Sequence, residues 1–265
     1  VHLFTRKHKM MKSREFSRRK FISTVSAGSA AAVVGGAVPA FGRITAIHSD
    51  TDKLAILGGT PVAPNKEWPE WPYVDERVVE EIVKTTRSGI WCRIQSANGT
   101  VSTFEKEFAR LMGTSSSICT GSGTQSLNTV VEALGIGPGD EVITSPYTDP
   151  GTIASILVSR ALPVMADLDP ESFQIDPEDV VRKITKRTRA VMPVHMMGQP
   201  CDLERIMSIA KSHGLYVIED ACQAHLAEYQ GKLLGTIGDA GCFSFQTSKV
   251  LSCGEGGGIV SHNEE

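Results

Sequence analysis

A carboxylate and a lysine are the two side chains whose surroundings best suit covalent chemistry. Asp220 follows the apolar, β-branched run 215–218, which predicts a buried strand that ends near this carboxylate. Lys249 follows a strand-like segment at 243–247 and precedes the glycine-rich turn 254–257, so its amine can reach into a cleft. A lysine amine can form a Schiff base with an aldehyde, and a buried carboxylate can keep a pyridine nitrogen protonated. Either residue alone is commonly a solvated lysine or a helix-capping aspartate, so the combination carries the argument.

Small residues at 121–124 form a second element of interest. They lie between the strand-like segment 117–120 and a helical pattern that runs through Leu134. The N-terminus of a helix presents free backbone N–H groups and the positive end of the helix dipole, which suits a phosphate group. An ordinary strand-to-helix turn would have the same composition, because Gly and Ser favour turns for conformational reasons.

The order of these motifs resembles the DegT/StrS-type sugar aminotransferases, which use pyridoxal 5'-phosphate (PLP). The resemblance rests on Glu-Asp-Ala-Cys-Gln-Ala-His at 219–225, on 243–249 and on Gly-Glu-Gly-Gly at 254–257. It implies that Asp220 and Lys249 are catalytic, as the pyridinium partner and as the Schiff-base lysine that also moves the substrate proton. The implied cofactor-binding set is Gly123, Thr124, Gln125, Asp220, Gln223, Ser244 and Lys249. In this set, residues 123–125 and Ser244 support the phosphate and Gln223 hydrogen-bonds the phenolic oxygen.

Short apolar runs alternate with helical patterns over most of the chain. Strands are predicted at 141–144, 163–166, 190–195 and 215–218, and helices at 75–88 and near 152–159, 177–184 and 203–213. Ser102 and Glu105 predict a capping box at the start of one further helix. The alternation predicts an α/β fold with a mostly parallel sheet and helices on both faces. The resemblance identifies this as the large domain of the fold-type-I PLP-dependent transferases.

We divide the chain into a signal segment (1–41), an N-terminal arm or linker (42–74) and a PLP-binding large domain (75–265). Members of the resembled family continue into a small C-terminal domain that closes the substrate cleft, and they form homodimers. We therefore expect the 265-residue chain by itself to be a poor catalyst.

The first 41 residues resemble a twin-arginine signal. Arg18 and Arg19 precede the uncharged stretch 22–41, which is rich in Ala, Gly, Ser and Val, and residues 38–40 offer a cleavage site. We expect export through the twin-arginine machinery to the periplasm or beyond. An uncleaved membrane anchor and a basic tail on a cytoplasmic protein are the alternatives.

The charge and the cysteine content argue against two classes of function, nucleic-acid binding and metal binding. Residues 1–40 hold eight Lys/Arg and one Asp/Glu, which leaves 19 basic and 29 acidic residues and a formal charge of −10 for the remainder. An acidic body argues against nucleic acid as a partner. The six cysteines form no C-x-x-C pair, which argues against a zinc site, and no other metal is expected.

On the resemblance, the reaction is transamination from glutamate or glutamine to a keto sugar or keto-cyclitol. The arm 57–61 with Trp68 and the segment 88–91 most resemble the keto-cyclitol branch, and an acidic body does not attract a diphosphate. We therefore expect an uncharged, hydroxyl-rich ketone as the acceptor. A noncatalytic regulatory or sensory protein of this fold remains an alternative, as does a PLP lyase or desulfurase, for which Cys253 is the only hint.

Asp149 departs from the family pattern. Many members have an aromatic residue there that stacks on the cofactor ring, whereas this sequence reads Ser-Pro-Tyr-Thr-Asp-Pro at 145–150. Asp149 either caps the helix that begins near 152 or meets a substrate hydroxyl, and Tyr147 could supply the ring contact instead. We interpret His195 and His225, which lie near the motifs, as structural residues.

Overall fold

The computed structural model describes residues 53–63 and 66–263. The chain divides into two compact units between Trp68 and Pro69. The described part of the first unit contains the 3-10 turn η2 (Ala55–Leu57). The signal segment predicted at 1–41 lies outside the described residues.

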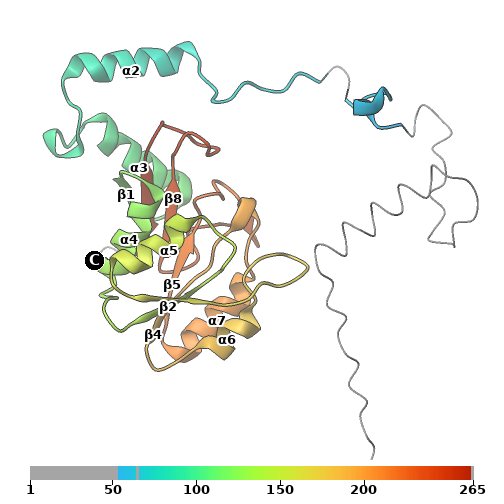
Figure 1. The fold of residues 1–265 in the computed structure, drawn as a ribbon. Coiled ribbons are helices and arrows are strands. Elements are labelled where there is room, and N and C mark those ends of the chain that lie inside the picture. Colours follow the sequence, from blue (N-terminus) through green and yellow to red (C-terminus); the bar gives the residue numbers. More distant parts are fainter. Residues whose placement is uncertain (1–52, 64–65, 264–265) are drawn as a thin grey trace, which may run out of the picture. The chain divides into compact units, whose positions relative to one another are not determined.

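A seven-stranded sheet forms the centre of the second unit (Figure 1). Its strands are β1 (Ser116–Thr120), β2 (Glu141–Thr144), β3 (Leu162–Met165), β4 (Thr188–Met192), β5 (Tyr216–Asp220), β8 (Ala240–Ser244) and β9 (Gly257–Ser261). Their order across the sheet is β1-β9-β8-β5-β4-β2-β3, and of these seven only β9 runs antiparallel to its neighbours. Two short strands, β6 (Glu228–Tyr229) and β7 (Lys232–Leu233), form a separate hairpin. The predicted mostly parallel sheet is confirmed.

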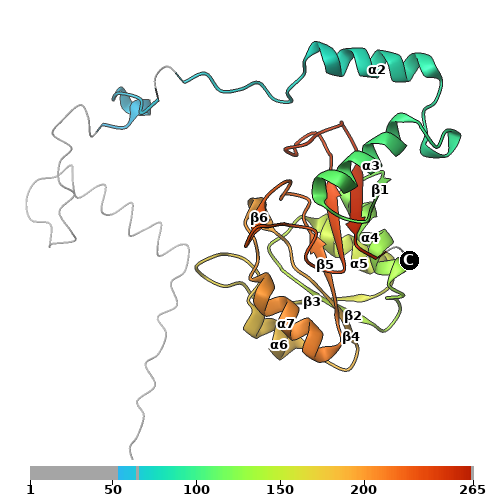
Figure 2. The same ribbon diagram turned by 180° about the vertical axis from the view of Figure 1, so that it is seen from behind.

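Helices cover both faces of this sheet, as predicted, and Figure 2 shows the second face. The helices are α2 (Glu76–Ser88), α3 (Thr100–Met112), α4 (Gly123–Ala133), α5 (Pro150–Val158), α6 (Pro177–Lys183) and α7 (Leu203–His213), with 3-10 turns η3 (Arg93–Gln95) and η4 (Met196–Gly198). Helices α4 and α5 pack on one face, and α3, α6 and α7 pack on the other. None of the described helices is long and apolar enough to cross a bilayer.

Successive residues of the central strands point to opposite faces, as the pleat of a strand requires. In β2, Val142 packs with the residues of α4 and α5, and Ile143 packs with those of α6 and α7. In β5, Ile218 and Val217 divide between the two faces in the same way. All four side chains are buried, so the strands read as continuous apolar runs in the sequence.

The capping box predicted at Ser102 and Glu105 is wrong. Helix α3 begins at Thr100 with Gly99 as its N-cap, so Ser102 already lies in the first turn. The buried Glu105 carboxylate instead accepts hydrogen bonds from Arg93 Nε and from the Cys119 N–H, each at 2.8 Å through Oε1. Glu105 therefore ties α3 to strand β1, a long-range role that the spacing of two residues does not reveal.

The amphipathic helix predicted at 75–88 is confirmed as α2, whose N-cap Asp75 accepts a hydrogen bond from the Val78 N–H. Its apolar side chains remain exposed among the described residues, from 40% for Val78 to 61% for Ile82.

Candidate active site

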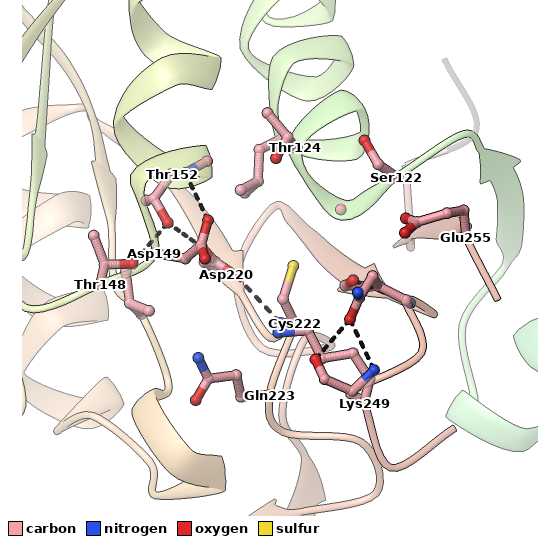
Figure 3. A pocket seen from close by; sticks show the side chains of 17 residues that line it. Ser122, Thr124, Thr148, Asp149, Thr152, Asp220, Cys222, Gln223, Lys249 and Glu255 are labelled. Carbon is pink, nitrogen blue, oxygen red and sulfur yellow. Dashed lines mark hydrogen bonds between the residues drawn. The ribbon is translucent and has the colours of Figure 1, made fainter. Parts of the chain in front are cut away.

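A cavity of about 400 Å³ lies where the carboxyl ends of β5 and β8 meet the N-termini of α4 and α5 (Figure 3). This edge of a parallel sheet is where α/β proteins bind their ligands. Six of the seven predicted cofactor residues line the cavity: Gly123, Thr124, Asp220, Gln223, Ser244 and Lys249. The fold thus brings together residues that are far apart in the sequence.

Gln125 is the predicted site residue that does not line this cavity. Its side-chain Oε1 accepts the Gly121 N–H at 2.7 Å, and its own N–H donates to Ser122 Oγ at 3.1 Å. Gln125 therefore braces the turn before α4. The small residues at 121–124 predicted a turn here, but they do not show which way the Gln125 side chain points.

The N-terminus of α4 forms one end of the cavity. Its first N–H groups, those of Gly123 and Thr124, have no partner within the helix because the first turn of any helix leaves them free. A Cβ atom on Gly123 would lie 2.7 Å from Cys222 Sγ and 2.8 Å from Ser244 Cβ, so only glycine fits here without a shift. This close-packed backbone cradle with free donors fits an anion such as a phosphate.

Asp220 ends β5, and only 5% of its surface is exposed. Its Oδ2 accepts a hydrogen bond from Thr152 Oγ1 at 2.7 Å, and its Oδ1 accepts one from the Cys222 N–H at 3.2 Å. Because the Thr152 proton is committed to Asp220, the Thr148 hydroxyl donates to Thr152 Oγ1 across the 2.7 Å between them. The two threonines therefore hold the carboxylate in one orientation at the cavity wall (Figure 3).

A second, fully buried carboxylate, Glu219, lies directly before Asp220. It accepts hydrogen bonds of 2.6–2.9 Å from His195 Nε2 and from the N–H groups of Gly235, Ile237 and Gly238. Burial alone would raise the pKa of Glu219, but His195 and the backbone donors outweigh it and lower the pKa. The His195 backbone N–H also donates to the Asp220 carbonyl at 3.0 Å. These contacts agree with the interpretation of His195 as a structural residue.

His225, unlike His195, packs against aromatic side chains. Its ring packs against Phe243 and Phe245, with centroid distances of 5.5 and 5.8 Å. Burial lowers its pKa, so the ring favours the neutral form. Neither ring nitrogen has a hydrogen-bond partner among the described residues.

Gln223 is fixed by a backbone group of η4. Its Oε1 accepts the Met197 N–H at 2.9 Å, which leaves the side-chain Nε2 as a donor. Met197 adopts a positive φ of 55°, which is rare for a residue with a side chain. A donor at this point of the cavity fits a phenolic or phenolate oxygen.

Lys249 lies in the loop between β8 and β9. Backbone hydrogen bonds from Thr247 to Gly254 and from Cys253 to Phe245, both 2.9 Å, close this loop. The lysine is partly buried and lines the cavity (Figure 3). Cys253 does not line it, and its thiol donates to the Glu255 carbonyl. The cysteine hint of a lyase or desulfurase therefore gains no support from the geometry.

Asp149 is the N-cap of α5, because its Oδ1 accepts the Gly151 N–H at 2.8 Å. The capping interpretation is confirmed, and Asp149 also lines the cavity. Tyr147 does not line it, and no aromatic side chain of the described chain does.

Several lining residues were not predicted: Ser122, Thr148, Thr152, Cys222, Ser248 and Glu255 are among them. Ser122 could have been found as the N-cap of α4, since serine before a helix is a recognisable signal. Burial and the neighbouring Asp220 raise the pKa of the Cys222 thiol well above its ordinary range, so this thiol stays neutral.

All six cysteines are free thiols, and Cys92 and Cys253 are exposed. Over residues 53–63 and 66–263, no three His, Cys, Asp or Glu side chains gather as metal ligands would.

Comparisons with known proteins agree with this arrangement. A putative L-glutamine:3-amino-2,3-dideoxy-scyllo-inosose aminotransferase of Streptoalloteichus tenebrarius is 44% identical over 214 residues, which are 81% of this chain and 51% of that protein. The crystal structure of 3-amino-5-hydroxybenzoic acid synthase superposes with a TM-score of 0.72 at 34% identity, over 75% of this chain and 51% of that one. An aminotransferase of Psychrobacter cryohalolentis gives a TM-score of 0.71 at 35% identity, over 75% of this chain and 50% of that one.

The chain thus spans about half the length of the relatives it matches. The structural neighbours share the fold-type-I architecture expected from the sequence. A model of the DegT/DnrJ/EryC1/StrS aminotransferase family matches residues 72–265, and the chain belongs to that family.

Proposed function

We propose that the protein containing this chain is a PLP-dependent aminotransferase that moves an amino group from glutamine or glutamate to a keto-cyclitol or a related keto sugar. The observation that carries the proposal is the meeting of Lys249, Asp220 and the free N-terminus of α4 in one cavity. An amine, a buried carboxylate and an anion site are the three partners that PLP needs. The family membership supports the same conclusion.

The residues present fit the cofactor. The N–H groups of Gly123 and Thr124 with the Ser244 hydroxyl would hold its phosphate, and Gln223 Nε2 would donate to its ring oxygen. Asp220 would pair with its ring nitrogen, because the two hydrogen bonds to this carboxylate leave lone pairs available. When bound, PLP supplies an aldehyde that takes up the amino group and a ring that accepts electrons from the substrate carbon.

Lys249 has two tasks in this proposal. Its amine holds the cofactor covalently until an amino donor displaces it. The freed amine at Nζ would then take a proton from the substrate carbon and deliver it to the carbon that was the cofactor's aldehyde, as a general base and acid in turn. Backbone hydrogen bonds close the loop between β8 and β9 that carries this lysine at the cavity wall.

The acceptor class rests on the relatives. Several with 38–44% identity are named for L-glutamine and inososes, which are ketones of cyclitols. Because these relatives are matched over about half their length, substrate choice in the whole protein is part of the proposal. A body with a formal charge of −10 offers no general attraction for the diphosphate of a nucleotide-linked sugar, which favours such a ketone.

The central test is the site of covalent attachment. The protein is incubated with PLP, reduced with borohydride and digested, and the pyridoxyl group is located by mass spectrometry. We expect it on Lys249 and expect none in Lys249→Ala. Lys211→Ala, which removes a lysine from the last turn of α7, is the matched control and should keep the label. A pyridoxyl group on another lysine, or on none, would refute the assignment.

We also propose that the protein is exported and works as a homodimer. The export proposal rests on Arg18-Arg19 and the uncharged stretch behind them, and the dimer on the resemblance to the family. Light scattering after size-exclusion chromatography tests the second, since a monomeric holoenzyme would contradict it.

A further inference from the structure

The loop between β8 and β9 that carries Lys249 is closed by hydrogen bonds of its own. Thr247 uses both of its donors in this way, because its N–H and its Oγ1 each donate to the Gly254 carbonyl at 2.9 Å. The Lys249 N–H donates to the Gln246 carbonyl at 2.8 Å, and the Ser248 N–H and Oγ donate to Gln246 Oε1 at 2.8 and 2.6 Å. The turn around the lysine is therefore fixed internally.

One hydrogen bond reaches this loop from a distant part of the described chain. Trp71 Nε1 donates to the Thr247 carbonyl at 3.0 Å, across 176 positions of sequence. Both residues belong to the second compact unit, which begins at Pro69. Among the described residues, every other hydrogen bond of 246–256 joins atoms within 244–256. The indole of Trp71 is thus the point at which another segment of the protein holds the loop.

A loop attached only at its two ends can tilt as a body, even when its interior is fixed. The two ends of this loop meet at Phe245, whose N–H donates to the Gly256 carbonyl at 2.8 Å. Trp71 adds a separate point of attachment, two residues before Lys249. This attachment restrains the tilt that the ends leave open, and it does so next to the residue whose direction matters most.

We propose that Trp71 is a positioning residue for Lys249, and that its indole N–H sets the angle from which the lysine amine enters the cavity. This inference rests on the proposed function, in which that amine binds the cofactor. Reactive groups must lie within about 0.5 Å of their productive position, so a tilted loop would impair attachment without unfolding the domain. Trp71 does not line the cavity, and it acts only through the loop.

Trp71→Phe is the decisive variant, because phenylalanine keeps an aromatic ring and removes the N–H donor. Trp91→Phe is the matched control: Trp91 Nε1 also donates to a backbone carbonyl, that of Thr86 at 3.3 Å in α2. The two tryptophans are 53% and 73% exposed, so neither substitution opens the core. Both variants should melt within a few degrees of the wild type.

The first measurement is amide hydrogen exchange over 246–256 in the cofactor-free protein. In Trp71→Phe, the amides of Thr247 and Lys249 should exchange about fivefold faster, which is the effect of losing one neutral hydrogen bond. Exchange in the strands should not change. Trp91→Phe should match the wild type in the loop. Equal loop exchange in Trp71→Phe and the wild type would show that the indole does not hold the loop.

The second measurement follows the visible absorption and circular dichroism of the whole protein as it takes up PLP. PLP is achiral, so its dichroism arises only when the protein holds it in one orientation. Trp71→Phe should bind PLP about fivefold more weakly and should show less dichroism per unit of absorbance. A loss of stability alone would lower the occupancy but not this ratio. Trp91→Phe should keep both values.

The outcomes separate the two proposals. A dichroic ratio in Trp71→Phe equal to that of the wild type would overturn the positioning role while leaving the Lys249 adduct intact. Absence of the pyridoxyl adduct in the wild type would instead remove the proposed function, and the positioning role with it. The exchange comparison needs no cofactor, so it would still show whether Trp71 holds the loop.

Discussion

The Thr152 hydroxyl donates a 2.7 Å hydrogen bond to Asp220, although the two residues are 68 positions apart in the sequence. The bond joins the first turn of α5 to the end of β5. It orients a buried carboxylate before any ligand arrives, which is the kind of support that precise sites require.

Replacement of Thr152 by Val should weaken PLP binding about tenfold and lower the free energy of unfolding by about 1–3 kcal/mol, because Asp220 Oδ2 loses its buried donor. Titration of the cofactor-free protein with PLP and urea denaturation measure the two effects. Thr152→Ser keeps the hydroxyl and should retain most of the affinity. Equal PLP affinities for Thr152→Val and the wild type would show that this bond does not position Asp220.

Gly123→Ala should disrupt the phosphate cradle, because the new Cβ would meet Cys222 Sγ and Ser244 Cβ at 2.7 and 2.8 Å. Overpacking of this kind costs about 1–3 kcal/mol, and PLP binding should fall with it. Gly137→Ala is the control, since the nearest atom to its Cβ would be the Ser159 carbonyl oxygen at 3.7 Å. Denaturation curves that rank the two variants in the opposite order would contradict the packing described at α4.

Because of Glu141, the free energy of unfolding should depend on pH in the acidic range. Its side chain is 5% exposed, and the Thr185 hydroxyl lowers its pKa most, against the opposing effect of burial and with further help from Arg187. A folded-state pKa below the unfolded value stabilises the fold above about pH 4.5, and this contribution disappears as the pH falls through the folded pKa.

Glu141→Gln should therefore unfold more easily than the wild type at pH 7, by about 1–3 kcal/mol, and the difference should shrink toward pH 3. Urea denaturation at both pH values measures it. Glu107 pairs with Arg110 on the surface, so Glu107→Gln should change little at either pH. A Glu141→Gln penalty that is as large at pH 3 as at pH 7 would rule out the charged form as its source.

The export proposal predicts that exchange of Arg18 and Arg19 for Lys leaves the precursor in the cytoplasm, because the twin-arginine pair would then no longer be recognised. Cell fractionation with detection of the processed form near Ala40 reports the result. Equal export of both proteins, or a wild type confined to the cytoplasm, would argue against the signal.

Local signals predicted most of the elements, and the resemblance to the family identified the central residues of the site. Helix α7 was predicted near 203–213 and has these bounds in the structure, where Asp202 caps its start and Gly214 adopts the left-handed conformation after its end. Lys249 and Asp220 were identified by their combination with the flanking motifs and by the resemblance to the family, and both line the cavity.

Residues that act across the fold were not predicted. The partners of Thr152 and Thr148 are set by the packing of α5 against the sheet, which no local spacing encodes. Gln125 was placed in the site although it turns back to Gly121, because a motif names a turn and not the direction of each side chain. Strand β9 was not predicted, because it begins with two glycines, which are rare in strands, and yet it pairs with both β1 and β8.

The place of β9 in the sheet also sets the order in which the protein can assemble. Among the described strands β1 is synthesised first, but its neighbour is β9, which leaves the ribosome last of these strands. During synthesis β1 therefore has no partner strand until β9 is made. The turn from β1 into α4 is held by the sheet only after β9 has paired with both β1 and β8. The nascent chain can consequently complete the proposed phosphate site only after β9 has been synthesised.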